Sequence, residues 1–193
     1  MQATGVPAAP LVNGKTRLFG VVGDPIGQVR SPQVYTALFR AHGINSVAIP
    51  FHVPPDKLSA FFAGLRGLRN LQGLIITIPH KLAAVAYVDD LTERARFVRS
   101  INFIMIKDDG RWIGDIVDGV GFVSNLQANG VQLAGRRALL VGAGGVGTAI
   151  AFALADAGVV DLAIFDLDQE RAARIVGELP RGNIRAAASP DPA

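Results

Sequence analysis

The chain has no cysteine, and this absence excludes three kinds of chemistry. Disulfides, thiolate metal sites and cysteine nucleophiles all need a side chain that none of the 193 residues provides. A cysteine-free chain fits the reducing cytoplasm, where we expect this protein to act. Histidine is scarce too, and His42, His52 and His80 are not spaced as metal ligands, so no metal site is predicted.

Basic stripes and membrane signals are also missing. Lys and Arg total 19 against 16 Asp and Glu, and no basic stripe is interleaved with aromatics, so no nucleic-acid partner is expected. The apolar stretch over 138–165 is interrupted by Asp156 and Asp161, which favours buried strands and a helix over a membrane span. The first fifteen residues lack a basic region before an apolar core, so we expect a flexible tail over 1–16 and no signal peptide.

Strand-like and helix-like segments alternate along the rest of the chain. Strands are expected at 18–22, 46–53, 73–78, 137–141 and 162–165, with a hairpin over 101–113. Helices are expected at 31–42, 55–65, 81–88, 92–98, 118–128, 148–157 and 169–179. Ser31 is expected to cap the first of these helices and Gly43 to end it. The pattern predicts an α/β fold with an open, mostly parallel sheet, and no element after Gly182.

A glycine-rich turn separates the strand at 137–141 from the following helix. A strand, a glycine turn and a helix in that order can hold a pyrophosphate on backbone N–H groups at the helix N-terminus. Gly142 would allow the tight turn, Gly144 the approach of phosphate, and Gly147 the packing of helix on strand. The alternative is a turn packed with Ala and Gly for structure alone. The cofactor-binding residues predicted here are Gly142, Ala143, Gly144, Gly145, Val146, Gly147, Asp166 and Leu167.

Asp166 indicates which dinucleotide the turn would bind. It ends the strand that follows the helix, where a carboxylate accepts hydrogen bonds from the adenosine ribose hydroxyls. A carboxylate there repels a 2′-phosphate, and Leu167 beside it offers no positive charge. The sequence therefore favours NAD over NADP as the cofactor.

The turn begins about three-quarters of the way along the chain, so most of the chain precedes the cofactor site. Two strands are too few to complete a nucleotide-binding sheet. We therefore expect the domain over 118–193 to be incomplete in this chain.

A second motif, Thr77-Ile78-Pro79-His80-Lys81, follows the strand at 73–78. Ligands gather at such carboxyl strand ends in α/β sheets. Taken alone, Lys81 would be a surface lysine and Asp118 a helix N-cap. Together with Gly20–Ile26, Ser31-Pro32, Ser100-Ile101-Asn102, Asp118–Phe122 and the glycine turn, this motif resembles the shikimate/quinate dehydrogenase family over about 17–180.

The resemblance implies a substrate-binding domain over 17–117, a C-terminal Rossmann domain over 118–193, and a cleft between them. It implies oxidation of a ring secondary hydroxyl of a cyclic hydroxy acid, with hydride transfer to the nicotinamide. Lys81 and Asp118 would be the catalytic pair, and Ser31, Thr77 and Asn102 would bind the substrate. The expected partner is a small molecule, and the expected state a monomer or homodimer.

Several usually polar positions of the family are apolar here. Val29 and Ile75 replace Ser and Asn, Phe103 replaces Thr, and Asp115-Ile116-Val117 replaces Tyr-Asn-Thr. Each lost partner costs on the order of 1–3 kcal/mol of shikimate binding. Arg30 is either a new carboxylate anchor or a solvent-facing residue. We expect a divergent, shikimate dehydrogenase-like enzyme with a less hydroxylated substrate or poor activity on shikimate; the alternative is a metabolite-sensing protein without turnover.

Overall fold

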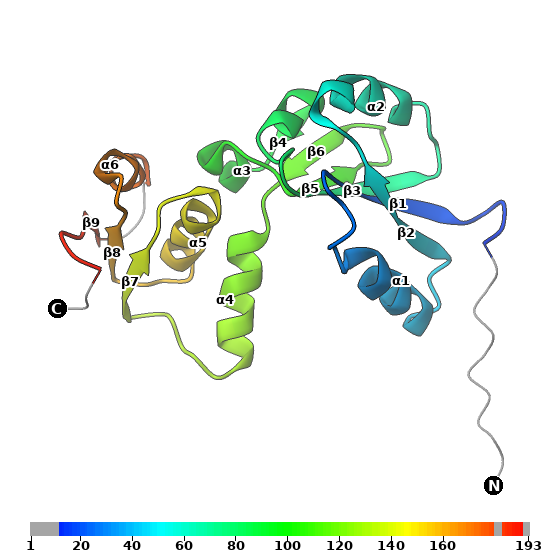
Figure 1. The fold of residues 1–193 in the computed structure, drawn as a ribbon. Coiled ribbons are helices and arrows are strands. Elements are labelled where there is room, and N and C mark those ends of the chain that lie inside the picture. The colour runs from blue at the N-terminus through cyan, green and yellow to red at the C-terminus, as the bar shows by residue number, and fades with distance from the viewer. Residues whose placement is uncertain (1–11, 180–182, 191–193) are drawn as a thin grey trace, which may run out of the picture. The chain divides into compact units, whose positions relative to one another are not determined.

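The computed structural model describes residues 12–179 and 183–190, and the chain forms two compact units (Figure 1). The first unit comprises Met1–Asp90 and Phe103–Ile113, and the second comprises Leu91–Asn102 and Gly114–Ala193. Of the tail expected over 1–16, residues 1–11 lie outside the described part. Residues 13–16 form a turn in which the buried Thr16 hydroxyl donates a hydrogen bond of 2.8 Å to Asn45 Oδ1.

The first unit is built on a mostly parallel sheet, as the sequence predicts. Its elements are β1 (Arg17–Gly23), α1 (Ser31–Ala41), β2 (Ser46–His52), the 3-10 helix η1 (Pro55–Lys57), α2 (Leu58–Leu65), β3 (Leu71–Ile76), the 3-10 helix η2 (Ala83–Tyr87) and β5 (Phe103–Ile106). β4 (Asp90–Leu91) and β6 (Trp112–Asp115) run on into residues of the second unit. The strand order is β2-β1-β3-β5-β6-β4; β1 is parallel to β2 and β3, and β5 is antiparallel to β3.

Continuous apolar strands form the centre of this unit. Val21, Val22, Leu74 and Ile76 are almost fully buried, which is typical of parallel strands that are covered on both faces. α1 and α2 lie on opposite faces of the sheet (Figure 1).

Two expectations about helices in the first unit were wrong in detail. Ser31 is the first residue of α1 and not its cap, because Arg30 occupies the cap position and no side chain caps the helix there. The helix expected over 81–88 is only the short η2. The prediction that Gly43 ends α1 is confirmed, since Gly43 has a φ of +66°.

The second unit contains a smaller parallel sheet. Its elements are α3 (Glu93–Val98), α4 (Asp118–Ala128), β7 (Arg137–Val141), α5 (Gly145–Asp156), β8 (Asp161–Phe165), α6 (Gln169–Glu178) and β9 (Asn183–Ala186), with strand order β7-β8-β9. The expectation of no element after Gly182 was wrong, because β9 pairs in parallel with β8. The segment has weak strand propensity, and pairing with a buried neighbour overrides it.

The helices of this unit pack closely because one glycine lies at their crossing. A Cβ on Gly119 of α4 would lie 2.0 Å from the backbone oxygen of Ala149 in α5, so only glycine fits there. Phe97 of α3 packs against Phe152 of α5, with ring centroids 5.4 Å apart. In the described part of the chain, no helix is both long and apolar enough to cross a membrane.

Candidate active and cofactor-binding sites

The glycine turn has the geometry that the sequence predicts at two of its glycines. Gly142 adopts a φ of +105°, and its N–H donates to the Phe165 oxygen at the end of β8 (2.8 Å). A Cβ on Gly147 would lie 2.0 Å from the backbone oxygen of Gly142. Gly142 and Gly147 are therefore required by the fold of the turn itself.

Gly144 and Gly145 differ from them. A Cβ on either residue would meet no heavy atom within 4 Å, so nothing in the protein demands glycine there. Gly144 takes the N-cap position of α5, and both residues are exposed at the helix N-terminus. These are the positions where a glycine allows a phosphate to approach the backbone closely, so the turn fits a dinucleotide pyrophosphate.

Asp166 binds the turn directly. Its Oδ2 accepts a hydrogen bond from the Ala143 N–H at 2.5 Å, and its Oδ1 accepts one from the Asp168 N–H at 2.8 Å. These N–H groups, that of Ala143 first, lower the pKa of Asp166 below its ordinary value. Leu167, next to it, is 93% exposed. The carboxylate expected to bind ribose thus also joins β8 to the glycine turn.

Thr148 is a residue of this turn that sequence reasoning missed. Its side chain is 1% exposed, and its hydroxyl donates to the Gly144 oxygen at 2.9 Å. A hydroxyl four residues after the N-cap of an apolar helix was the available signal, since Thr often bonds back to the preceding turn. Thr148 and Asp166 hold opposite ends of the Ala143–Gly144 segment.

A hollow of about 460 Å³ lies beside Asp166. It is lined by Asp166, Gln169, Glu170 and alanines of α6 and of residues 186–188. None of the described residues that line it is Lys or Arg, so its charged side chains are both acidic. The hollow follows the ends of β8 and β9, the edge where α/β sheets bind ligands.

In the first unit, Thr77 and Lys81 follow the carboxyl end of β3. The Thr77 N–H donates to the Val22 oxygen at 2.9 Å, and a Cβ on Gly23 would lie 2.5 Å from Thr77 Cγ2. His80 is 1% exposed and donates through Nε2 to the Val53 oxygen at 2.7 Å, which fixes the turn that carries Lys81. Lys81 itself is half-buried.

Ser31 also follows the carboxyl end of a strand, because α1 begins after the loop that leaves β1. Ser31 and Val29 are half-buried, and Arg30 between them is exposed. Two of the apolar replacements are neighbours, since Ile75 in β3 and Phe103 in β5 are direct register partners. The first unit thus places Ser31, Thr77 and Lys81 after adjacent parallel strands.

Asn102 and Asp118 lie together in the second unit. Asn102 Nδ2 donates to Asp118 Oδ1 at 2.7 Å, and Asn102 Oδ1 accepts from the Val117 N–H at 2.9 Å. Asp118 is the first residue of α4 and Val117 occupies the cap position, so the interpretation of Asp118 as the N-cap was wrong. Its carboxylate is bound by Asn102.

A buried carboxylate holds the segment just before Asp118. Asp115 accepts hydrogen bonds from the Thr92 hydroxyl (2.6 Å), from Arg94 Nε (2.7 Å) and from the Ile116 N–H (2.8 Å), and Arg94 also donates to its second oxygen. Burial raises the pKa of Asp115, but the hydrogen bonds from Arg94 and Thr92 outweigh it, so the pKa lies below its ordinary value. Thr92 is the N-cap of α3, so Asp115 ties β6 to that helix.

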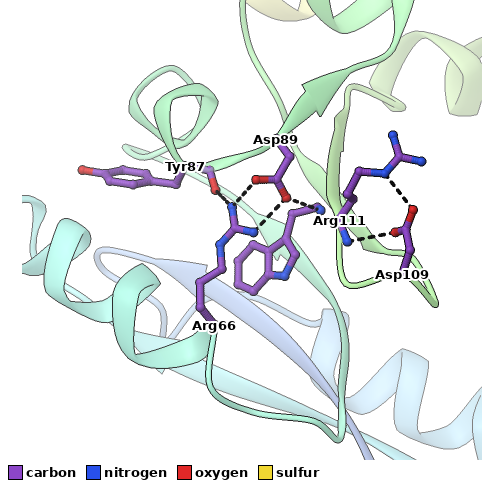
Figure 2. Close-up of polar contacts among 6 residues, drawn as sticks. Arg66, Tyr87, Asp89, Asp109 and Arg111 are labelled. Carbon is purple, nitrogen blue, oxygen red and sulfur yellow. Dashed lines mark hydrogen bonds and ion pairs between the residues drawn. The ribbon is translucent and has the colours of Figure 1, made fainter.

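The first unit has a carboxylate cluster of its own, and its role is structural (Figure 2). Arg66 donates to both oxygens of Asp89 (2.8 and 3.0 Å) and to the Tyr87 oxygen, and its guanidinium lies 4.5 Å from the centroid of the Trp112 ring. The hydrogen bond from Arg66, then that from the Trp112 N–H, lowers the pKa of Asp89. This cluster joins the residues after α2 to those after η2. Among the described residues, no group of three or more acidic or histidine side chains is placed to hold a metal ion.

The second unit has a parallel strand, a glycine turn that is open at two positions, and a carboxylate at the end of the next strand. Together these features define a Rossmann-type α/β protein. Residues 21–104 match the family model of the shikimate dehydrogenase substrate binding domain. The chain belongs to the shikimate/quinate dehydrogenase family.

Three relatives illustrate the similarity. The shikimate dehydrogenase (NADP(+)) of Symbiobacterium thermophilum is 40% identical over 168 residues, which cover 87% of this chain and 56% of that protein. The shikimate 5-dehydrogenase of Listeria monocytogenes, solved with shikimate and NAD, has a TM-score of 0.85 at 28% identity, covering 91% of this chain and 62% of that one. The quinate dehydrogenase of Corynebacterium glutamicum, solved with NAD, has a TM-score of 0.77 at 27% identity, covering 89% and 64%. The chain thus spans little more than half the length of the first of these relatives.

Proposed function

We propose that this protein is a nicotinamide-dependent dehydrogenase that oxidises a ring secondary hydroxyl of a cyclic hydroxy acid in the cytoplasm. The observation that carries the proposal is the open backbone at Gly144 and Gly145, at a turn whose other glycines the fold itself explains. Family membership supports the same reaction, because relatives of this chain are named for it. In this proposal residues 17–117 serve as the substrate-binding domain, and residues 118–193 belong to the cofactor-binding domain.

The chemistry needs a hydride acceptor, which the nicotinamide supplies when bound. Backbone N–H groups at Gly144 and Gly145 would hold the pyrophosphate, and Ala143, Val146 and Leu167 would line its path. Asp166 would accept hydrogen bonds from the ribose hydroxyls. It would use the carboxylate lone pairs that the N–H groups of Ala143 and Asp168 leave available.

We propose NAD as the preferred cofactor. Hydrogen bonds to Asp166 favour its ionised form, and Glu170 adds a second carboxylate to the same hollow. A 2′-phosphate would meet both charges there, with only Leu167 at the next position. The Symbiobacterium relative is named for NADP(+), so this preference would be a departure within the family. Asp166→Ala combined with Leu167→Arg is expected to shift the preference toward NADP, and an unchanged preference would contradict the assignment.

Lys81 and Asp118 would handle the proton. A secondary alcohol must lose its hydroxyl proton as hydride leaves the carbon, and a lysine ammonium stabilises the developing alkoxide while its neutral form accepts the proton. A carboxylate at the same hydroxyl orients it toward the lysine. Ser31, Thr77 and Asn102 are proposed to hold the rest of the ring acid.

The substrate is proposed to carry fewer ring hydroxyls than shikimate. Ile75 and Phe103 are register partners on neighbouring strands, at positions where the family usually has polar side chains. They would therefore present an apolar surface to a ligand bound at the carboxyl end of β3. A hydroxyl placed against such a surface would lose its hydrogen bonds, at a cost on the order of 1–3 kcal/mol each. That corresponds to roughly 5- to 150-fold weaker binding per hydroxyl.

A substrate panel tests the proposal. Shikimate, quinate and ring acids with fewer hydroxyls are each mixed with the protein and either NAD or NADP, and reduced nicotinamide is followed by its absorbance. We expect reduction of NAD, fastest with a less hydroxylated acid. Binding of an acid by calorimetry without any nicotinamide reduction would overturn the dehydrogenase assignment in favour of a metabolite-sensing protein.

A further inference from the structure

Hydrogen-bond donors from three residues of the second unit converge on the carboxylate of Asp115. Its Oδ1 accepts from the Thr92 hydroxyl (2.6 Å), from Arg94 Nε (2.7 Å) and from the Ile116 N–H (2.8 Å), and Arg94 also donates to Oδ2. The side chain of Asp115 is only 5% exposed. An ionised carboxylate only accepts hydrogen bonds, so it satisfies all of these donors at once.

The same residue joins the two chain segments that carry Asn102 and Asp118. Its backbone oxygen accepts from the Asn102 N–H at 2.9 Å, and its carboxylate accepts from the Ile116 N–H in the segment that enters α4. Thr92, which also binds this carboxylate, is the N-cap of α3, the helix that leads to Asn102. The backbones on both sides of the Asn102–Asp118 contact are therefore held by one residue.

We propose that Asp115, held by Arg94, is a positioning residue that sets the spacing between Asn102 and Asp118. The proposal rests on the proposed function for the roles of these two residues, and it keeps Asn102 as a substrate ligand. Asn102 and Asp118 also bind each other directly, and Asp118 has other contacts as well. Loss of Asp115 should therefore loosen the pair and not separate it.

The contacts of Asp115 matter most when substrate is bound. A substrate hydroxyl that binds both Asn102 and Asp118 competes with the hydrogen bond between them, because an amide has only two N–H donors. The side-chain contacts of Asp115 use neither of these donors, so they still hold the two backbones in that complex. Misplacement of reacting groups by about 1 Å can cost on the order of 100-fold in rate.

Two variants and a matched control test the proposal. Asp115→Ala removes every side-chain contact of the residue, and Arg94, which is 34% exposed, can then turn to solvent. Arg94→Lys keeps the positive charge but loses the two-pronged guanidinium contact, so it is the milder change. Ile175→Val shortens a fully buried side chain of α6 in the same unit and leaves these segments untouched, so it reports general destabilisation.

Hydrogen exchange of the free chain is measured by NMR. In Asp115→Ala, exchange of the Asn102 and Ile116 N–H groups should speed up at least about tenfold more than that of the Leu162 N–H in the central strand β8. Arg94→Lys should show a smaller effect in the same direction, and the control should speed up Leu162 at least as much as the other two. Exchange that speeds up no more at Asn102 and Ile116 than at Leu162 in both variants would overturn the proposal.

The exchange measurement needs no turnover, so it decides the proposal even if the substrate panel shows no NAD reduction. Where the panel shows turnover, Asp115→Ala should lower kcat about 10- to 100-fold and raise KM severalfold, because proton transfer and the Asn102 contact both lose alignment. Arg94→Lys should recover part of kcat, and Ile175→Val should leave both constants within about twofold of the parent. Parent-like kcat and KM in Asp115→Ala would contradict the positioning role and leave the dehydrogenase assignment standing.

Discussion

The Asp166 carboxylate at the end of β8 accepts a hydrogen bond of 2.5 Å from the Ala143 N–H in the glycine turn after β7. This contact means that the residue proposed to select the cofactor also holds the turn proposed to bind it. The two roles are separable, because the turn can be tested by unfolding without any ligand.

Asp166→Asn should destabilise the protein in a pH-dependent way. The N–H groups of Ala143 and Asp168 lower the folded-state pKa of Asp166, so its stabilising effect is complete above the unfolded-state value of about 3.9 and is lost as pH falls through the lower folded-state value. Urea unfolding at pH 7 should show the variant less stable than the parent, and the difference should shrink below about pH 3. A difference of equal size at both pH values would contradict this account of Asp166.

The Arg94–Asp115 pair should be costly to break from one side. Arg94→Met leaves the buried Asp115 carboxylate without its main partner, at a cost of roughly 3 kcal/mol. The double variant Arg94→Met/Asp115→Asn has no unpaired charge and should be closer to the parent than Arg94→Met alone. A double-mutant cycle by urea unfolding measures this, and strictly additive losses would show that the two residues are not coupled.

Gly119→Ala should destabilise the second unit, because the new Cβ would lie 2.0 Å from the Ala149 oxygen and force α4 away from α5. Gly121→Ala in the same helix meets no atom within 4 Å and should be neutral or stabilising by up to about 1 kcal/mol. Thermal unfolding should give a melting temperature clearly below that of the parent for Gly119→Ala, and one equal to or above that of the parent for Gly121→Ala. Equal melting temperatures for both variants would contradict the close crossing.

Gly144→Ala separates binding from folding. The position is open and its φ of −71° suits alanine, so the loss of stability should be limited to that of a poorer N-cap, about 1 kcal/mol. NAD binding by calorimetry should be lost, because the methyl group occupies the space where phosphate meets the backbone. Gly147→Ala is the contrasting variant and should lose stability itself, since its Cβ would lie 2.0 Å from the Gly142 oxygen. If Gly144→Ala binds NAD as tightly as the parent, the pyrophosphate does not bind at Gly144 and the assignment is contradicted.

Local sequence signals predicted the parts of the fold that depend on local chemistry. Apolar runs mark the buried strands β3 and β8, and Gly43 and Gly142 mark places where the backbone needs a positive φ. β9 was missed because its pairing with β8 is a tertiary contact that its own composition does not encode. Ser31 and Asp118 were predicted as N-caps, but each is the first residue of its helix, one position after the cap. An error of one residue is common at helix ends.

The candidate site divides in the same way. Gly144, Asp166 and Lys81 stand in motifs with fixed spacing, so sequence alone nominates them. The contacts of Asn102 with Asp118 and of Thr92 with Asp115 join residues 16 and 23 positions apart, and no periodic pattern links them. Only the fold shows that these side chains meet.

The central claim is tested most directly by measuring hydride transfer in variants of Lys81 and Asp118, the two residues proposed to transfer the proton. Protein, NAD and the best ring acid from the panel are mixed, and reduced nicotinamide is followed for the parent, Lys81→Met and Asp118→Asn. The account predicts that the parent reduces NAD and that each variant still binds the acid but reduces NAD about 10²- to 10⁴-fold more slowly. NAD reduction at the parent rate by both variants would contradict the account.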